Sequence, residues 1–192
     1  MSTQQRTSTD AALSAAGVTV WLTGLSGAGK STIATAAVDE LRAAGLAATI
    51  LDGDVLRCGL NSNLGFGAED RAEAVRRAGE AALLLASSGV TVVAALISPY
   101  RADRDRVRAR HADAGVPFVE VFVDAPLEVV ESRDPKGLYA KARAGHIPAF
   151  TGISDPYEAP SSPELRLPTA TMRKEDCVQA VVRAVRSAAT SR

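Results

Sequence analysis

Between residues 24 and 31 the chain reads Gly24-Leu25-Ser26-Gly27-Ala28-Gly29-Lys30-Ser31, and Thr32 follows. This stretch fits the phosphate-loop pattern G-x-x-x-x-G-K-S/T, in which glycines let the backbone curl around phosphate oxygens. The N–H groups of such a loop face the phosphates, and the positive end of the next helix adds to them. We expect the stretch to bind a triphosphate, with Lys30 at its β- and γ-phosphates and the Ser31 hydroxyl on Mg²⁺.

The residues on either side of this loop decide between a phosphate site and an ordinary glycine-rich turn that caps a helix. Residues 18–23 are apolar and β-branched, as in a buried strand. Residues 31–44 form an amphipathic helical pattern, with one apolar face made of Ile33, Ala37, Val38 and Leu41. Strand, loop and helix follow one another in the order that the mechanism requires, so we predict a phosphate-binding loop.

Composition restricts the class of protein. The length of 192 residues suits one domain, and the 22 basic and 22 acidic residues cancel, which favours neither nucleic acid nor an anionic membrane as a partner. The sequence shows no apolar run of transmembrane length and no signal pattern. Cys58 and Cys177 lack metal-site spacing and are interpreted as free thiols. We predict a cytoplasmic protein with a flexible tail (residues 1–17) and a single domain (residues 18–192).

Two carboxylates follow the next predicted strand, residues 46–51. This strand ends in Asp52-Gly53-Asp54, at the carboxyl edge where open α/β sheets bind their ligands. An isolated Asp-Gly turn could simply carry solvated acids. Beside a phosphate loop, we expect Asp52 and Asp54 to hold Mg²⁺ and to orient or deprotonate a hydroxyl nucleophile. The strand predicted over residues 90–97 ends in no Asp, which strengthens this assignment.

Arginines flank an aromatic loop in the middle of the chain. Residues 55–67 are too rich in Gly and Asn to be regular throughout, and a long helix is predicted from residue 68 to 88. Arg57 and Arg71 lie on either side of Phe66, a combination that suggests an anionic, aromatic ligand. The alternative is an arginine-rich helix face exposed to solvent.

The remaining pattern completes the fold class. A charged helix over residues 101–114 is expected mostly at the surface, with His111 exposed or near a helix cap. A strand (116–124), a helix (126–133) and a C-terminal helix (175–188) follow. Residues 133–160 are rich in Pro, Gly and basic side chains, which fits either a lid over polyphosphate or a surface excursion. We predict an α/β fold of the P-loop NTPase type: a doubly wound parallel sheet with helices on both faces and a mobile lid segment.

Several short motifs in a consistent order resemble one family, the adenylylsulfate kinases (APS kinases). These enzymes use MgATP to phosphorylate the 3′-hydroxyl of adenosine 5′-phosphosulfate (APS). The resemblance covers about residues 18–167. Besides the phosphate loop, its landmarks are Leu51-Asp52-Gly53-Asp54, Asn63-Leu64-Gly65-Phe66, Glu69-Asp70-Arg71, Ile97-Ser98-Pro99-Tyr100-Arg101, Arg133-Asp134-Pro135-Lys136-Gly137-Leu138-Tyr139 and Phe150-Thr151-Gly152-Ile153.

The resemblance implies a role for each matching position. It places ATP on the phosphate loop, and Asp52 and Asp54 at Mg²⁺ and the nucleophilic hydroxyl. The implied APS-side residues are Arg57 and Arg71 at the phosphosulfate, Phe66 and Phe150 stacked on the adenine, Ile97 and Ser98 in the pocket, and Lys136 and Lys141 near phosphates. The candidate catalytic residues are Asp54, Asp52, Lys30 and Ser98. The family's phosphoserine role for Ser98 is not expected, because in-line transfer between two bound nucleotides needs no covalent stop.

The chain departs from the family pattern at three positions. Val55 stands where the family often has Asn, and Cys58 where it often has His. Ala74 replaces an Asn that contacts APS, and the loss of one amide hydrogen bond, on the order of 1 kcal/mol, predicts weaker APS binding. The resemblance also implies a homodimer and a functional partnership with ATP sulfurylase, to which the domain is fused in some relatives.

The sequence therefore predicts an alcohol-group phosphotransferase that converts APS and ATP into 3′-phosphoadenosine 5′-phosphosulfate (PAPS) and ADP, in sulfate activation and assimilation. One alternative is another small P-loop kinase, acting on a sugar, a shikimate-like acid or a nucleoside monophosphate. Another is a catalytically silent nucleotide sensor or regulatory partner of a sulfurylase. The intact Lys30, Ser31, Asp52 and Asp54 argue against the silent protein.

Overall fold

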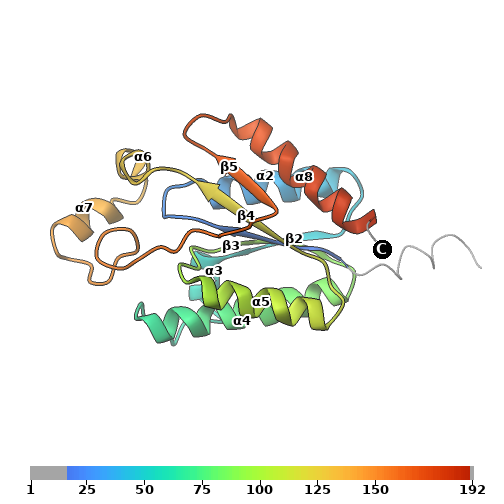
Figure 1. Ribbon diagram of the computed structural model, residues 1–192, viewed down its shortest axis with the longest axis horizontal. Helices are drawn as coiled ribbons and strands as arrows, with labels where there is room; N and C mark the ends of the chain where they lie inside the picture. The colour runs from blue at the N-terminus through green and yellow to red at the C-terminus, as the bar shows by residue number, and fades with distance from the viewer. Residues whose placement is uncertain (1–16, 191–192) are drawn as a thin grey trace, which may run out of the picture.

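A five-stranded parallel sheet forms the centre of the molecule (Figure 1). The computed structural model describes residues 17–190, so the predicted tail lies outside it except for Gly17. The strand order is β2-β3-β1-β4-β5, and every pairing is parallel. The strands are β1 (Thr19–Thr23), β2 (Ala48–Asp52), β3 (Thr91–Ala95), β4 (Phe118–Asp124) and β5 (Leu165–Pro168).

Helices cover both faces of this sheet (Figure 1). α2 and α8 pack together on one face, and α4 and α5 pack together on the other. The bounds are α2 (Lys30–Ala43), α3 (Gly53–Arg57), α4 (Ala68–Ser87), α5 (Arg101–Asp113), α6 (Leu127–Arg133), α7 (Leu138–Arg143) and α8 (Lys174–Thr190). The predicted doubly wound α/β fold is confirmed. None of the helices in the described range is long and apolar enough to cross a membrane.

The central strand β1 explains the apolar run that precedes the phosphate loop. All five of its residues are buried. Successive side chains of a strand point to opposite faces, so Val20 and Leu22 pack under α2 and α8, whereas Trp21 packs with Val75 and Val107 under α4 and α5. A strand buried on both faces is largely apolar. Because β1 is the central strand, the loop that follows it lies at the middle of the sheet edge.

The expectation that His111 is exposed is wrong, although His111 does lie in the last turn of α5, and α5 is mostly exposed as predicted. Its inner face buries Asp103, Arg104, Val107 and His111. His111 is fully buried, with Nδ1 2.9 Å from the Val107 carbonyl and Nε2 3.0 Å from the Thr19 hydroxyl. A carbonyl only accepts, so Nδ1 donates and Nε2 accepts. Burial lowers the pKa of His111, which favours this neutral form.

Two further details differ from the sequence prediction. The Asp-Gly-Asp segment is not a simple turn, because Gly53 begins the short helix α3 and the Asp52 side chain caps it by accepting from the Asp54 N–H. The fifth strand, β5, is not among the strands predicted from the sequence. It is an edge strand of four residues that ends at Pro168, where a missing N–H is tolerated. Cys58 and Cys177 are both free thiols, as predicted.

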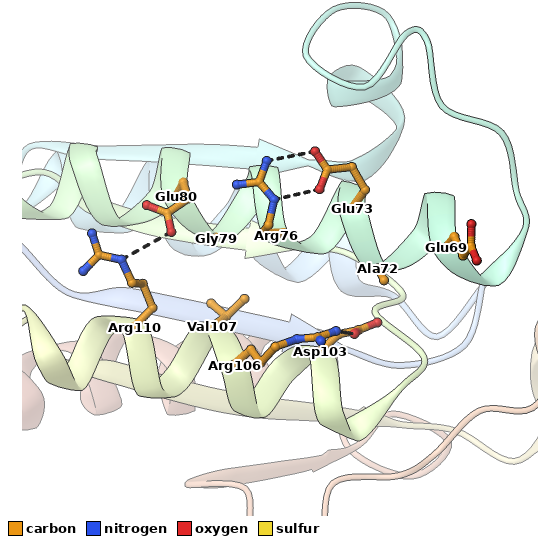
Figure 2. A pocket seen from close by; sticks show the side chains of 10 residues that line it. All are labelled: Glu69, Ala72, Glu73, Arg76, Gly79, Glu80, Asp103, Arg106, Val107 and Arg110. Atoms are coloured by element: carbon orange, nitrogen blue, oxygen red, sulfur yellow. Dashed lines mark hydrogen bonds and ion pairs between the residues drawn. The ribbon is translucent and has the colours of Figure 1, made fainter.

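The contact between α4 and α5 depends on Gly79. A Cβ atom at this position would lie 2.7 Å from Cγ2 of Val107 and 3.0 Å from its Cγ1. Figure 2 shows the two residues facing each other in a groove of about 490 Å³ between the helices, whose rim carries Glu73, Arg76, Glu80, Arg106 and Arg110. None of the predicted site residues lines this groove.

We predict that Gly79→Ala lowers the free energy of unfolding. Alanine in a helix normally stabilises by about 0.5–1 kcal/mol over glycine, whereas overpacking a core costs about 1–3 kcal/mol. The clash with a branched side chain should therefore dominate. Combining Gly79→Ala with Val107→Ala should cost less than the sum of the single changes, measured by urea unfolding. Additive effects would contradict the proposed contact.

Candidate active site

Glycines hold the phosphate loop against the sheet. A Cβ atom on Gly24 would lie 2.4 Å from the Val123 carbonyl of β4, so only glycine allows this approach. Gly29 adopts φ +104° and forms the N-cap of α2. Such a left-handed backbone favours glycine. The loop therefore places residues 24–32 together, between the end of β1 and the first turn of α2.

Lys30 lies inside this loop. Its side chain is buried, and Nζ donates to the carbonyls of Gly24 at 2.8 Å and Leu25 at 2.7 Å. Burial lowers the pKa of Lys30 to about 8, and the carboxylates of Asp52 and Asp54 oppose that shift. The ammonium group and the two acids thus belong to one electrostatic site, although they come from different elements.

The predicted metal residues meet where β2 ends beside α2. Ser31 Oγ donates to Asp52 Oδ2 at 2.5 Å, and Asp52 Oδ1 accepts from the Asp54 N–H at 2.9 Å. These hydroxyl and carboxylate oxygens suit Mg²⁺, which usually binds one or two carboxylates together with substrate phosphates. Consistent with that, residues 17–190 hold no cluster of three or more His, Cys, Asp or Glu able to bind a metal alone.

Asp54 is exposed and forms an ion pair with Lys136. Lys136 lies between α6 and α7, in the predicted lid, so this pair joins the lid to the acidic residues. The other predicted lid lysine, Lys141, is exposed on α7. It is not among the partners of Lys30 or Asp54 in the described part of the chain.

Arg71 links the two segments that carry the predicted aromatic residues. This buried side chain donates from Nε to the Phe66 carbonyl and from Nη2 to the Ala149 carbonyl, each at 2.8 Å. The Arg57 guanidinium lies 4.0 Å from the centre of the exposed Phe66 ring. Phe150 is buried, edge-on to Tyr139 at 5.0 Å. Arg57, Phe66 and Arg71 are therefore brought together as predicted.

The segment that follows β3 lies at the same edge of the sheet as the phosphate loop. Ser98 is buried with φ +39°, and its Oγ accepts from the indole N–H of Trp21 at 3.1 Å. The Thr23 hydroxyl donates to the Ile97 carbonyl at 2.7 Å. Ile97 and Ser98 thus lie beside the end of β1, the strand that leads into the phosphate loop.

Some contacts of the loop were not identified from the sequence. The Tyr139 hydroxyl donates to the Ser26 carbonyl at 2.9 Å, and the Thr169 hydroxyl donates to the Ala28 carbonyl at 2.9 Å. Tyr139 lies in one of the resemblance landmarks, whereas no local pattern singles out Thr169. A groove of about 520 Å³ runs between Leu25 of the loop and residues 152–157. Lid residues therefore contact the phosphate loop directly through Tyr139, and others border a groove between the loop and residues 152–157.

Comparison with known proteins agrees with this geometry. The family model described as adenylylsulphate kinase matches residues 16–168. An adenylyl-sulfate kinase of Saccharomyces cerevisiae is 56% identical over 161 residues, 84% of this chain and 80% of that protein. A Mycobacterium tuberculosis APS kinase, solved with AMPPNP and APS, superposes with a TM-score of 0.87 at 49% identity, covering 90% of this chain and 99% of that one. A hexameric APS kinase from Thiobacillus denitrificans gives 0.68 at 33% identity, covering 93% of this chain and 30% of that chain.

We predict that nucleotide affinity falls above a pH of about 8. Triphosphate favours the protonated Lys30, whose pKa in the free protein is lowered to about 8. Below that pH the affinity should be constant, and above it the affinity should fall about tenfold for each pH unit. Calorimetric titration with AMPPNP between pH of about 7 and 10 measures this. The Lys30→Arg variant, whose guanidinium keeps its charge, should give a flat profile. A flat profile for the unchanged protein would contradict the prediction.

Proposed function

Because the chain belongs to the adenylylsulphate kinase family, we propose that it transfers the γ-phosphoryl group of ATP to the 3′-hydroxyl of APS, giving PAPS and ADP. This reaction activates sulfate. One observation in particular supports APS as the acceptor: buried Arg71 binds the backbone beside both predicted adenine-stacking residues, Phe66 and Phe150. A cation between two aromatic segments suits a nucleotide with a charged phosphosulfate.

The donor half uses residues that already lie together. Lys30, inside the loop, stabilises negative charge on the transferring group, which is the main contribution a protein makes to phosphoryl transfer. Ser31 and Asp52, joined by a hydrogen bond, would hold Mg²⁺ with Asp54 nearby. When bound, Mg²⁺ supplies positive charge at the β- and γ-phosphates.

Asp54 orients the acceptor hydroxyl and takes its proton. Its carboxylate is exposed at the edge of the sheet, whereas Asp52 is committed to Ser31 and to the cap of α3. Lys136 holds Asp54 from the lid, so the same lysine can transfer its contact to a phosphate when the substrates enter. Lys141 on α7 is assigned to the phosphates as well.

The acceptor half binds APS through charge and stacking. Arg57 and Arg71 are assigned to the phosphosulfate, and the exposed Phe66 ring is available to the adenine. Phe150 is only 8% exposed, so stacking on it requires the lid segment to move. Ile97 and Ser98 line the pocket. Ser98 accepts from Trp21 within the protein, which supports a role in shaping the pocket rather than a phosphoserine intermediate.

We further propose a cytoplasmic homodimer that works with ATP sulfurylase. The family resemblance supports the dimer, and the Thiobacillus denitrificans neighbour is described as hexameric. Partnership with ATP sulfurylase is supported by the fusion of the two domains in some relatives.

The acceptor is tested by ADP release from ATP in a coupled assay. APS should stimulate ADP release strongly, because Arg57, Phe66 and Arg71 form a site for an anionic nucleotide. Gluconate and AMP should not replace it. Stimulation by either of these compounds but not by APS would favour a different small kinase. If none of the three compounds stimulates ADP release, the result would favour a silent nucleotide-binding protein.

We predict that Asp54→Ala lowers kcat by at least about 100-fold, because the hydroxyl proton loses its acceptor. The dissociation constant for AMPPNP at a pH of about 7, where Lys30 is protonated in either protein, should change by less than about threefold. Asp39→Ala removes an exposed carboxylate of α2 outside the site and serves as the control. Near-normal turnover of the Asp54 variant would contradict its assigned role.

A further inference from the structure

Arg104 of α5 joins three separate parts of the active-site edge. Its side chain is 1% exposed. Nε donates to Glu120 Oε1 on β4 at 2.8 Å, and Nη1 donates to the Ser98 carbonyl at 2.7 Å. Nη2 donates to the Glu158 carbonyl, also at 2.7 Å. The planar fork of the guanidinium fixes these three acceptors relative to one another, which a lysine cannot do.

The first acceptor anchors the arginine to the sheet. Glu120 is buried and also pairs with Arg108 at 3.2 Å. Its backbone N–H donates to Glu164 Oε2 at 2.7 Å. The carboxylate is therefore held from two sides, and Arg104 is aimed from a rigid base at the carbonyls of Ser98 and Glu158.

The second acceptor belongs to the pocket loop, residues 96–100. Ser98 adopts a positive φ, which strains the backbone of a non-glycine residue, so neighbouring contacts must hold it. Trp21 binds its side chain and Thr23 binds the Ile97 carbonyl, both from β1. Arg104, which follows the pocket loop in the chain and lies on α5, donates to the Ser98 carbonyl.

The third acceptor belongs to the return limb, residues 150–159, which is the last part of the predicted lid segment. The Glu158 N–H donates to the Pro99 carbonyl at 2.9 Å, and Glu158 Oε2 accepts from the Arg101 N–H at 2.7 Å. Three residues earlier, Asp155 accepts from the Tyr100 hydroxyl and lies 3.8 Å from Arg71. The second half of the limb, residues 155–159, is thus tied to the pocket loop and to the start of α5.

We propose that Arg104 is a positioning residue for the acceptor substrate: it sets the separation between the pocket loop and the return limb. The inference rests on the proposed function. Arg104 hydrogen-bonds to neither the phosphate loop nor the reacting groups, and its two carbonyl acceptors, Ser98 and Glu158, belong to segments that we assign to the APS side. Its loss should therefore weaken APS binding and leave ATP binding unaffected.

The test compares Arg104→Lys with Arg108→Lys. Arg104→Lys keeps a cation beside Glu120 but loses the two carbonyl contacts, and it should raise the KM for APS about tenfold with the KM for ATP within about twofold. Arg108→Lys alters the same Glu120 cluster without touching the pocket loop or the limb, and it should leave both KM values unchanged. An unchanged KM for APS, or an equal rise in both KM values, would overturn the proposal.

Trp21 provides an independent readout. It is the chain's single tryptophan, and its indole donates to Ser98. Arg104→Lys should change its fluorescence well below the melting temperature, and Arg108→Lys should not.

A second variant tests the proposal if Arg104→Lys does not fold. Arg101→Ala removes an exposed hydrogen bond to the return limb, the 3.0 Å bond from Arg101 Nη2 to the Ala159 carbonyl. This variant should still raise the KM for APS a few-fold, and an unchanged value would overturn the proposal. If instead the protein without any substitution is inactive with APS, the proposed function itself would be overturned.

Discussion

The close approach of Gly24 to the Val123 carbonyl fixes the phosphate loop at the centre of the sheet edge, and the other parts of the site are arranged around it. Since β3 lies between β1 and β2, the acids at the end of β2 must reach across the end of β3 to meet the loop. They do so through the hydrogen bond from Ser31 to Asp52. An acid at the end of β3 would be closer to β1, but that position carries the pocket loop with Ser98.

Most charged groups of the site have a partner within the described part of the protein. Lys30 binds loop carbonyls, Asp52 binds Ser31, and Asp54 binds Lys136. Arg71 binds two backbone carbonyls, from segments far apart in the chain. Burying or crowding unpaired charges is costly, so these contacts keep the site organised until substrates exchange with them. The ion pair between Lys136 and Asp54 also joins the predicted lid segment to the acidic residues.

The sequence predicts the donor half of this site well because that half is built locally. The loop, its two flanking elements and the Asp-Gly-Asp segment each lie within a few residues, and their chemistry is visible in the residue types. The interior role of α5 could not be predicted in the same way. Residues 103, 104, 107 and 111 do share one helix face, but polar residues on a helix normally indicate a solvent-exposed face. Their partners, Glu120 and Thr19 among them, are remote in sequence.

The contrast between the donor half and the acceptor half of the site follows from what each substrate requires. Phosphate is bound by backbone N–H groups and one cation, which a single loop can supply. A nucleotide with a phosphosulfate needs cations, aromatic faces and a shaped pocket, and the residues proposed to supply them lie on or beside α3, α4, the loop after β3 and the return limb. Holding four such segments in register needs long-range ties, and the buried guanidinium groups of Arg71 and Arg104 provide them through backbone carbonyls. Carbonyls carry no residue identity, so contacts of this kind leave no motif in the sequence.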